Sequence, residues 1–406
     1  MPTPELPFLT ANLPGTGGAI RERAEDFVVE EVPAYQPSGG GEHTWLFVEK
    51  TGISTVEAVR RLSRAFGARE GDFGYAGHKD AQAVTRQWIS ARKVEPKRAW
   101  TTSAPGLKIL DVSRHGNALK TGHLAGNRFE ITARGVTEDA EARARKVMAE
   151  LARRGSPNWF GEQRFGARDD SDLVGRELVR GSAEGALKVL LGSPKPDDAE
   201  AQRRARELFD AGKLEEALRE WPGRNHAERE ALSKLARGAA PEQALMAWNK
   251  RLRFLFVSAC QSRMFNAVLS ARLERLDRVE DGDLAFLHRN GAVFKVEDAA
   301  REQPRAERFE ISPSGPLFGY KVLLATGKPG EAEGLILAQS GLSLEDFKNP
   351  LALKARGERR ALRVPLGETS VRAVEEEGRR ALVLKFGLPA GSFATAVLRE
   401  VMKTGS

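Results

Sequence analysis

The segment Phe73–Asp80 combines residue types that suit nucleophilic or acid–base chemistry. Gly74 and Gly77 allow sharp backbone paths and the close approach of a ligand, and the carboxylate of Asp80 directly follows Lys79. A nearby cation favours the ionised carboxylate that a nucleophile or base requires. Neighbouring residues of an extended strand point to opposite faces, so these two side chains share a pocket only if the segment turns. The alternative is a surface turn with a solvated Lys–Asp pair.

Two further segments join charged or amide groups to aromatic rings. Arg21 and Phe27 flank Glu25 and Asp26 near the N-terminus, which also fits a charged strand entry with Phe27 in the core. At Gly126–Phe129 an amide, a cation and a ring follow one another. Such a set suits recognition of a nucleobase and its phosphate. It equally suits a turn followed by a strand in which Phe129 is buried.

Two aromatic segments lie farther along the chain. Residues 156–166 contain two glycines, three aromatic residues and Arg164, which also fits a well-packed loop between domains. Near the C-terminus, Ser392 is suited to cap a final helix with Phe393 just inside it. That segment alone is typical of an ordinary helix start.

The charge balance favours a phosphate-rich partner. Lys and Arg number 64 against 56 acidic residues, a formal net charge of +8. Guanidinium groups bind phosphate oxygens bidentately, so such a balance is typical of nucleic-acid binding. A soluble enzyme from an organism with Arg-rich proteins has the same composition.

Several other kinds of protein are excluded or disfavoured by the sequence. Cys260 is the only cysteine, so an intramolecular disulfide and Cys-rich zinc or iron–sulfur sites are excluded, which fits a reducing cytoplasm. The six histidines lack metal-ligand spacing, and we expect no metal. No long apolar run or signal peptide is present, so we expect no membrane segment. Phosphate-loop, dinucleotide and nucleophile-elbow motifs are also absent.

Periodicity places these segments on predicted elements. Ser54 is expected to cap a helix that runs to about Phe66 and ends at Gly67. A second helix is expected from Thr137 to Arg154, and helical periodicity continues through most of residues 170–276. Alternating or β-branched patterns predict strands at Phe27–Glu31, His43–Lys50, Val84–Ser90, Leu107–Ser113, Arg128–Ala133, Leu284–Lys295, Leu317–Leu323, Ala361–Pro365 and Ala381–Phe386.

Strands therefore lie at both ends of the chain, and the most helical block lies between them. A chain of this length normally forms more than one domain. We predict an α+β fold: one domain with a mixed, mainly antiparallel sheet flanked by helices, formed by residues 1–154 and 351–406. An inserted α/β domain is predicted for residues 155–350, since such insertions are easy when the termini pair within one domain.

Taken together, the motifs resemble the TruD family of tRNA pseudouridine synthases. Any one of these motifs is weak, but their order along the chain is specific, and together they cover nearly the whole sequence. The motifs are R-x-x-x-E-D-F-x-V-x-E at 21–31, G-x-K-D-x-x-A-V-T-x-Q at 77–87, G-N-R-F at 126–129, N-W-F-G-x-Q-R-F-G at 158–166, S-R-M-F-N at 262–266 and L-P-A-G-S-F-A-T-x-V-L-R-E at 388–400.

The resemblance implies roles for seven residues. Asp80 corresponds to the family's catalytic aspartate. Phe129 matches the aromatic residue that stacks on the target base, where many other synthases use Tyr. Arg21 stands where a basic residue, often Lys, is expected to form a salt bridge. Asn127 and Phe27 match pocket residues near the active site, and Phe393 matches a further aromatic residue of the C-terminal motif. Together with Phe129, Arg21 and Lys79 of the G-x-K-D motif, they form the expected substrate-binding set.

The implied reaction needs no cofactor. The catalytic domain is expected to have the pseudouridine-synthase fold, and the insertion is expected to be the family's TRUD domain. The expected substrate is uridine 13 of a tRNA, and a monomeric cytoplasmic enzyme is expected, without membrane or nucleotide-cofactor partners. Asp80 attacks C1′ of the flipped-out nucleotide or removes the 2′ proton to give a glycal. Two other hypotheses are an RNA-binding protein that has lost catalysis and an RNA methyltransferase, which would need a cofactor loop.

Overall fold

The computed structural model describes residues 6–223, 226–246 and 248–404. The chain divides into two compact units, and each is considered by itself. One unit consists of Phe8–Ser156 and Val364–Ser406, and the other contains Pro157–Arg363. The predicted insertion ended at residue 350. The compact unit continues to Arg363 because the strand at Glu358–Ala361 pairs with Ile311–Leu317 of the same unit.

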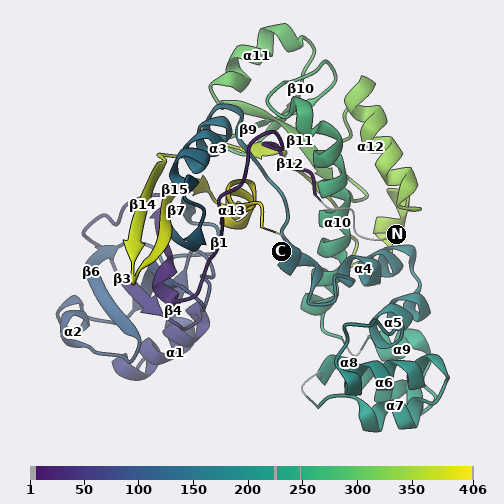
Figure 1. The fold of residues 1–406 in the computed structure, drawn as a ribbon. Coiled ribbons are helices and arrows are strands. Elements are labelled where there is room, and N and C mark those ends of the chain that lie inside the picture. The colour runs from purple at the N-terminus through teal and green to yellow at the C-terminus, as the bar shows by residue number, and fades with distance from the viewer. Residues whose placement is uncertain (1–5, 224–225, 247, 405–406) are drawn as a thin grey trace. The chain divides into compact units, whose positions relative to one another are not determined.

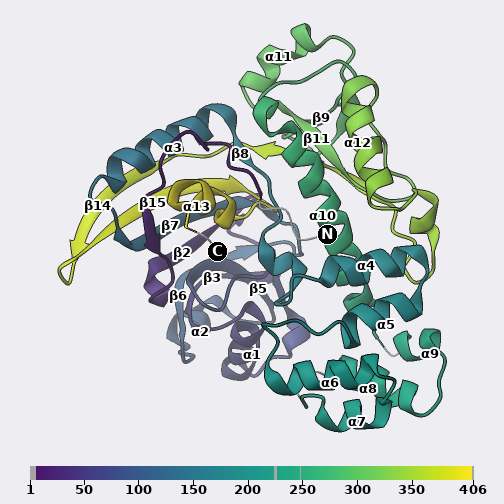
Figure 2. The same ribbon diagram turned by 45° about the vertical axis from the view of Figure 1, so that its right-hand side comes forward.

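The first unit is built on a sheet to which both ends of the chain contribute. Its main path has the order β14-β15-β7-β2-β5-β3-β6, with β1 beside β7 and β4 beside β5 (Figures 1 and 2). The elements are β1 (Gly17–Ala19), β2 (Phe27–Pro33), β3 (His43–Thr51), α1 (Thr55–Phe66), β4 (Phe73–Tyr75), β5 (Val84–Arg92), α2 (Pro96–Thr101), β6 (Leu107–His115), β7 (Leu124–Val136), α3 (Ala140–Arg154), β14 (Ser370–Glu376), β15 (Arg379–Pro389) and α13 (Ala394–Met402).

Only one pair of neighbouring strands in this sheet is parallel. β2 runs parallel to β5, and the other pairs along the sheet are antiparallel. α3 packs against α13 and β14 (Figure 2). The predicted mixed, mainly antiparallel sheet flanked by helices is therefore confirmed.

Helix α1 shows how local sequence sets these elements. The hydroxyl of Ser54 accepts a hydrogen bond from the backbone N–H of Glu57, and Gly67 ends the helix in the left-handed conformation at φ 62°. Both helix-end predictions are confirmed. The apolar face of α1 packs on one face of β3 and β5, where Leu46, Val48 and Ile89 are buried. Trp45 and Phe47 lie on the opposite face, as strand alternation requires.

The second unit contains a helical part and a small antiparallel sheet of order β10-β9-β11-β12. The long helix α10 contacts α4, α12 and β11 (Figure 1). The elements are α4 (Ser171–Arg180), α5 (Ala183–Leu191), α6 (Glu200–Asp210), α7 (Leu214–Glu220), α8 (His226–Ala236), α9 (Pro241–Leu245), α10 (Lys250–Arg272), β9 (Leu284–Leu287), β10 (Val293–Lys295), α11 (Ala299–Glu307), β11 (Ile311–Leu317), α12 (Gly327–Gln339) and β12 (Glu358–Ala361). Strands β8 (Ser156–Pro157) and β13 (Arg363–Val364) lie where the chain passes between the units.

Two strand predictions in this region are wrong in position. The strand expected at Leu317–Leu323 lies instead at Ile311–Leu317, and the one expected at Ala361–Pro365 is split into β12 and β13. The sequence of β11, ISPSGPL, contains two prolines and a glycine and resembles a turn. Its burial between β9 and β12 decides its conformation.

Candidate active site

The parallel pairing of β2 and β5 brings Arg21 and Asp80 together. Val28 of β2 pairs with Val84 of β5, so the segments that precede both strands reach the same edge of the sheet. Arg21 lies in the segment before β2, and Asp80 lies in the loop before β5. β3 runs antiparallel to β5 and ends at this edge, where Lys50 pairs with Thr85. Three separate segments therefore meet around Asp80.

The carboxylate of Asp80 is held by a cation and a backbone N–H. Arg21 donates from Nη2 to Oδ2 of Asp80 over 2.8 Å, and the N–H of Gln82 donates to Oδ1 over 3.0 Å. The side chain of Asp80 remains 36% exposed, and that of Arg21 is 22% exposed. The carboxylate is thus fixed in direction and accessible to a substrate, which is the arrangement that a nucleophile or base needs.

Lys79 points to a buried carboxylate. Its ammonium lies 3.0 Å from Oε2 of Glu31 and donates to Oδ1 of Asn127 over 2.7 Å. The side chain of Lys79 is 6% exposed and that of Glu31 is fully buried. Burial raises the pKa of Glu31, and the neighbouring ammonium opposes this shift. The cation that pairs with Asp80 is therefore Arg21, and Lys79 is paired with Glu31 and Asn127.

Side chains from α1 and β5 pin the loop that carries Lys79. The hydroxyl oxygen of Thr55 accepts from the backbone N–H of Lys79 over 2.9 Å and donates to Oε1 of Gln87. Gln87 in turn donates to the carbonyl of Gly77 over 3.3 Å. A side chain at Gly77 would meet open space, whereas one at Gly74 would lie 2.3 Å from the carbonyl oxygen of Leu119. Only Gly74 is therefore required by packing.

Three phenylalanines and Arg21 form an aromatic cluster next to Asp80. The guanidinium of Arg21 lies 4.4 Å from the ring centroid of Phe27. The edge of Phe27 meets Phe129 at 6.3 Å, and Phe129 stacks on Phe386 at 5.4 Å. Phe129 pairs directly with Phe386 across β7 and β15, so the sheet register sets this stack. Phe129 is 8% exposed.

The remaining predicted site residues lie on β7 and at the start of α13. Asn127 lies within β7, opposite Glu31 of β2 and Leu388 of β15. Gly126–Phe129 is therefore part of a strand. Phe393 is the N-cap residue of α13 and is 38% exposed. The prediction that Ser392 caps this helix, with Phe393 inside it, is wrong by one residue.

Four residues that contact the predicted site were not predicted from the sequence: Glu31, Thr55, Phe386 and Lys50, whose Nζ donates to the main-chain carbonyl of Asp80. Lys50 carried a usable signal, because it continues the strand face of Leu46 and Val48, where an apolar residue is expected. Phe386 gave no such signal, because its partner Phe129 can be identified only when the pairing of β7 with β15 is known.

The motifs at 158–166 and 262–266 hold each other within the second unit. Asn266 accepts from the N–H of Phe160 over 3.0 Å and donates to its carbonyl over 2.9 Å. The guanidinium of Arg263 lies 3.7 Å from the ring centroid of Phe165 and pairs with Asp172. These contacts explain why an aromatic, turn-rich segment is ordered there.

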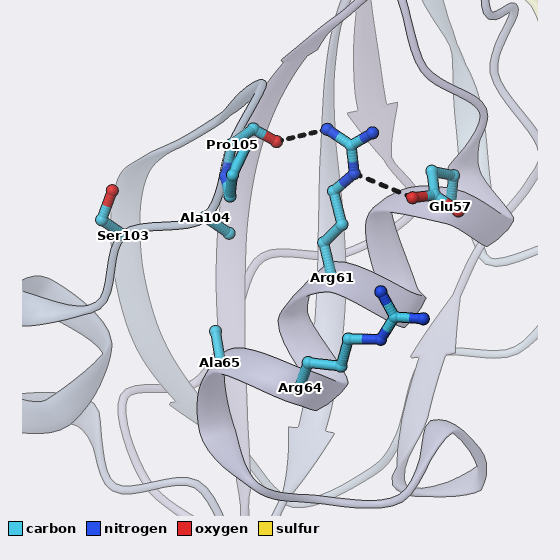
Figure 3. Close-up of a pocket in the computed structure, with 7 residues that line it drawn as sticks. All are labelled: Glu57, Arg61, Arg64, Ala65, Ser103, Ala104 and Pro105. Carbon is cyan, nitrogen blue, oxygen red and sulfur yellow. Dashed lines mark hydrogen bonds and ion pairs between the residues drawn. The ribbon is translucent and has the colours of Figure 1, made fainter.

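A surface pocket of about 550 Å³ lies between α1 and the loop before β6 (Figure 3). Arg61 crosses it, donating to Glu57 over 2.9 Å and to the carbonyl of Pro105 over 2.6 Å. None of the predicted site residues lines this pocket.

No group of three or more His, Cys, Asp or Glu side chains could hold a metal ion in the part of the chain that the structure describes. Across the same residues, no helix combines the length and the apolar character needed to span a bilayer.

Comparisons with known proteins agree with the motifs. The family model described as tRNA pseudouridine synthase D (TruD) matches residues 5–401. The tRNA pseudouridine synthase D of Geobacter metallireducens is 50% identical over 402 residues, covering 99% of this chain and 98% of the relative. That of Geobacter sulfurreducens is 49% identical over 397 residues, covering 98% and 96%.

A solved structure is also similar. The crystal structure of the Methanosarcina mazei protein described as tRNA pseudouridine synthase D is 30% identical, with a TM-score of 0.88. The match covers 100% of this chain and 99% of that one. The chain therefore belongs to the tRNA pseudouridine synthase D (TruD) family of enzymes.

Proposed function

We propose that this protein converts a uridine of tRNA into pseudouridine without a cofactor, and that this uridine is uridine 13. The observation that carries this proposal is the carboxylate of Asp80. It is partly exposed, pairs with Arg21 at 2.8 Å and lies at the edge of an aromatic cluster. An accessible, oriented carboxylate beside apolar rings suits a reaction that detaches a nucleobase and keeps it in place.

The reaction is an isomerisation, so its atoms balance without a co-reactant. The N1–C1′ bond breaks, a C5–C1′ bond forms, C5 loses a proton and N1 gains one. The Asp80 carboxylate either bonds to C1′ or removes the 2′ proton. In both routes this carboxylate must lie beside the ribose of the target nucleotide. Flipping the nucleotide out of the RNA costs a few kcal/mol, which binding contacts must supply.

The aromatic cluster suits retention of the detached uracil. We assign base stacking to Phe129, whose rear support is its stack on Phe386. Phe27 supports Phe129 from the side and carries the guanidinium of Arg21. Asn127 and Lys79 contribute polar groups next to the aromatic cluster. We also assign Phe393 to the substrate-binding set.

The decisive experiment uses an unmodified tRNA transcript and the full chain. We expect pseudouridine to form at position 13 with a chelator present and no cofactor added, as read by nucleotide-resolution mapping. A transcript with cytidine at position 13 is the matched control and should remain unmodified. Binding of the transcript without any pseudouridine would favour an RNA-binding protein that has lost catalysis.

We also propose that the protein acts as a monomer in the cytoplasm. The single cysteine, Cys260, is buried, and burial raises the pKa of its thiol to about 12, so it is an inert packing residue. Light scattering should give the mass of one chain without tRNA and that of one chain plus one tRNA with it; a stable dimer would contradict the monomer.

Binding of tRNA should weaken steeply as salt is added. The chain carries a net charge of +8, and each neutralised phosphate releases counterions on binding. With about four phosphate contacts, the affinity should fall about 100-fold between about 50 mM and about 200 mM salt. Titration by fluorescence anisotropy measures this slope, with sucrose as the uncharged control. A flat response would contradict recognition dominated by phosphate.

A further inference from the structure

Lys50 is a buried lysine on the core face of β3. It is 1% exposed and follows Leu46 and Val48 on the same strand face. Even with its hydrogen bonds satisfied, a buried ammonium typically stabilises a fold no more than an apolar side chain of similar volume does. The presence of Lys at this position therefore calls for a reason other than packing.

The contacts of Lys50 lead directly to the loop of Asp80. Its Nζ donates to the main-chain carbonyl of Asp80 over 2.8 Å and to that of Ile53 over 2.5 Å. Burial lowers the pKa of Lys50 to about 8; the charge of Asp80 opposes this shift and that of Lys79 adds to it. The ammonium thus ties the chain beyond β3 to the chain before β5.

The charged groups that face Lys50 are already engaged with other partners. Asp80 uses its carboxylate oxygens for Arg21 and for the N–H of Gln82. Lys79 turns to Glu31 and Asn127. Lys50 consequently acts on the backbone of Asp80, whereas Arg21 acts on its carboxylate.

We propose that Lys50 is a positioning residue, which holds the main chain at Asp80 so that the carboxylate meets C1′ of the bound nucleotide. This inference rests on the proposed function. The carbonyl of Asp80 is bonded to the same Cα that carries the reactive side chain, so a shift of the peptide moves the carboxylate with it. A misplacement of about 1 Å in such a group costs about 100-fold in rate.

The experiment compares Lys50→Met with Lys403→Met in the full chain. Lys403 is a matched control, because its Nζ also donates to two main-chain carbonyls, those of Thr10 and Leu13, and burial also lowers its pKa. It anchors the N-terminal segment and has no assigned part in the site. Both variants are assayed with an unmodified tRNA transcript under single-turnover conditions, and circular dichroism verifies folding.

Lys50→Met is expected to lower the single-turnover rate about 100-fold while the Kd for tRNA stays within about twofold of the wild type. Lys403→Met should retain the wild-type rate. A rate for Lys50→Met close to that of the wild type would overturn the assignment. Failure of both Lys50→Met and Lys50→Gln to fold would also overturn it, because Lys50 would then be needed for the fold itself. Absence of pseudouridine with wild-type protein would instead refute the proposed function.

Discussion

Asp80→Asn is expected to abolish pseudouridine formation and leave tRNA binding nearly unchanged. The amide has the shape of the carboxylate and still accepts the hydrogen bond that Gln82 donates to Asp80, but it lacks the negative charge needed to attack C1′ or to remove a proton. Removal of a nucleophile typically costs about 10⁴-fold or more in rate. Single-turnover assays with a tRNA transcript give the rate, and anisotropy gives the Kd.

Asp111→Asn is the matched control for Asp80→Asn. Asp111 is an exposed aspartate of β6 whose Oδ1 also accepts from a nearby backbone N–H, that of Val112 at 2.7 Å. It should retain the wild-type rate. If Asp80→Asn retained that rate as well, Asp80 would have no part in the chemistry and the proposed mechanism would be lost.

Lys79→Met is expected to lower both stability and activity. It leaves the fully buried side chain of Glu31 without its cation. Breaking a buried pair from one side typically costs about 3–5 kcal/mol, which for a unit of this size corresponds to a fall in Tm of about 6–20 °C. Activity should fall because Lys79 and Asp80 share one loop. Thermal denaturation at several pH values and the single-turnover assay measure the two effects.

The stability loss of Lys79→Met should depend on pH in a definite direction. Burial raises the pKa of Glu31, and Lys79 opposes this shift, so removal of the lysine raises the pKa of Glu31 further. The folded variant then binds a proton that the unfolded chain releases, and its stability falls as pH rises through the folded pKa of Glu31. The deficit relative to wild type should therefore be smallest at acidic pH.

Two further variants test that explanation of Lys79→Met. Glu31→Gln combined with Lys79→Met removes the buried charge and should recover much of the lost stability. Lys385→Met is the matched control, since Lys385 lies 3.0 Å from Glu130, as Lys79 does from Glu31, but both partners are about half exposed. Its loss should be at most about 1 kcal/mol. Equal losses of stability in Lys79→Met and Lys385→Met would mean that burial of the Lys79–Glu31 pair does not increase its contribution to stability.

Local features of the chain were predictable because they depend on neighbouring residues. Ser54 and Gly67 mark the ends of α1, and alternation separates Leu46 from Trp45 across β3. By contrast, β14 was not predicted, because its sequence SVRAVEE is mostly polar and lacks a regular alternation of apolar and polar residues. Its pairing with β15 along seven residues decides its conformation. The same reason explains the shifted position of β11.

The chain's own sequence determined the family, the order of the motifs and the identity of Asp80, Phe129 and Arg21 as candidates for the site. The resemblance implied a salt bridge for Arg21 without naming its partner, and tertiary structure decided which cation meets Asp80. Lys79 is adjacent in sequence but points to Glu31, whereas Arg21 is distant in sequence and pairs with the carboxylate. The physical reason is that the side chains of neighbouring residues point in different directions. The parallel pairing of β2 with β5, in contrast, brings two loops that are remote in sequence to one edge of the sheet. Such pairing depends on long-range contacts that no short window of sequence contains.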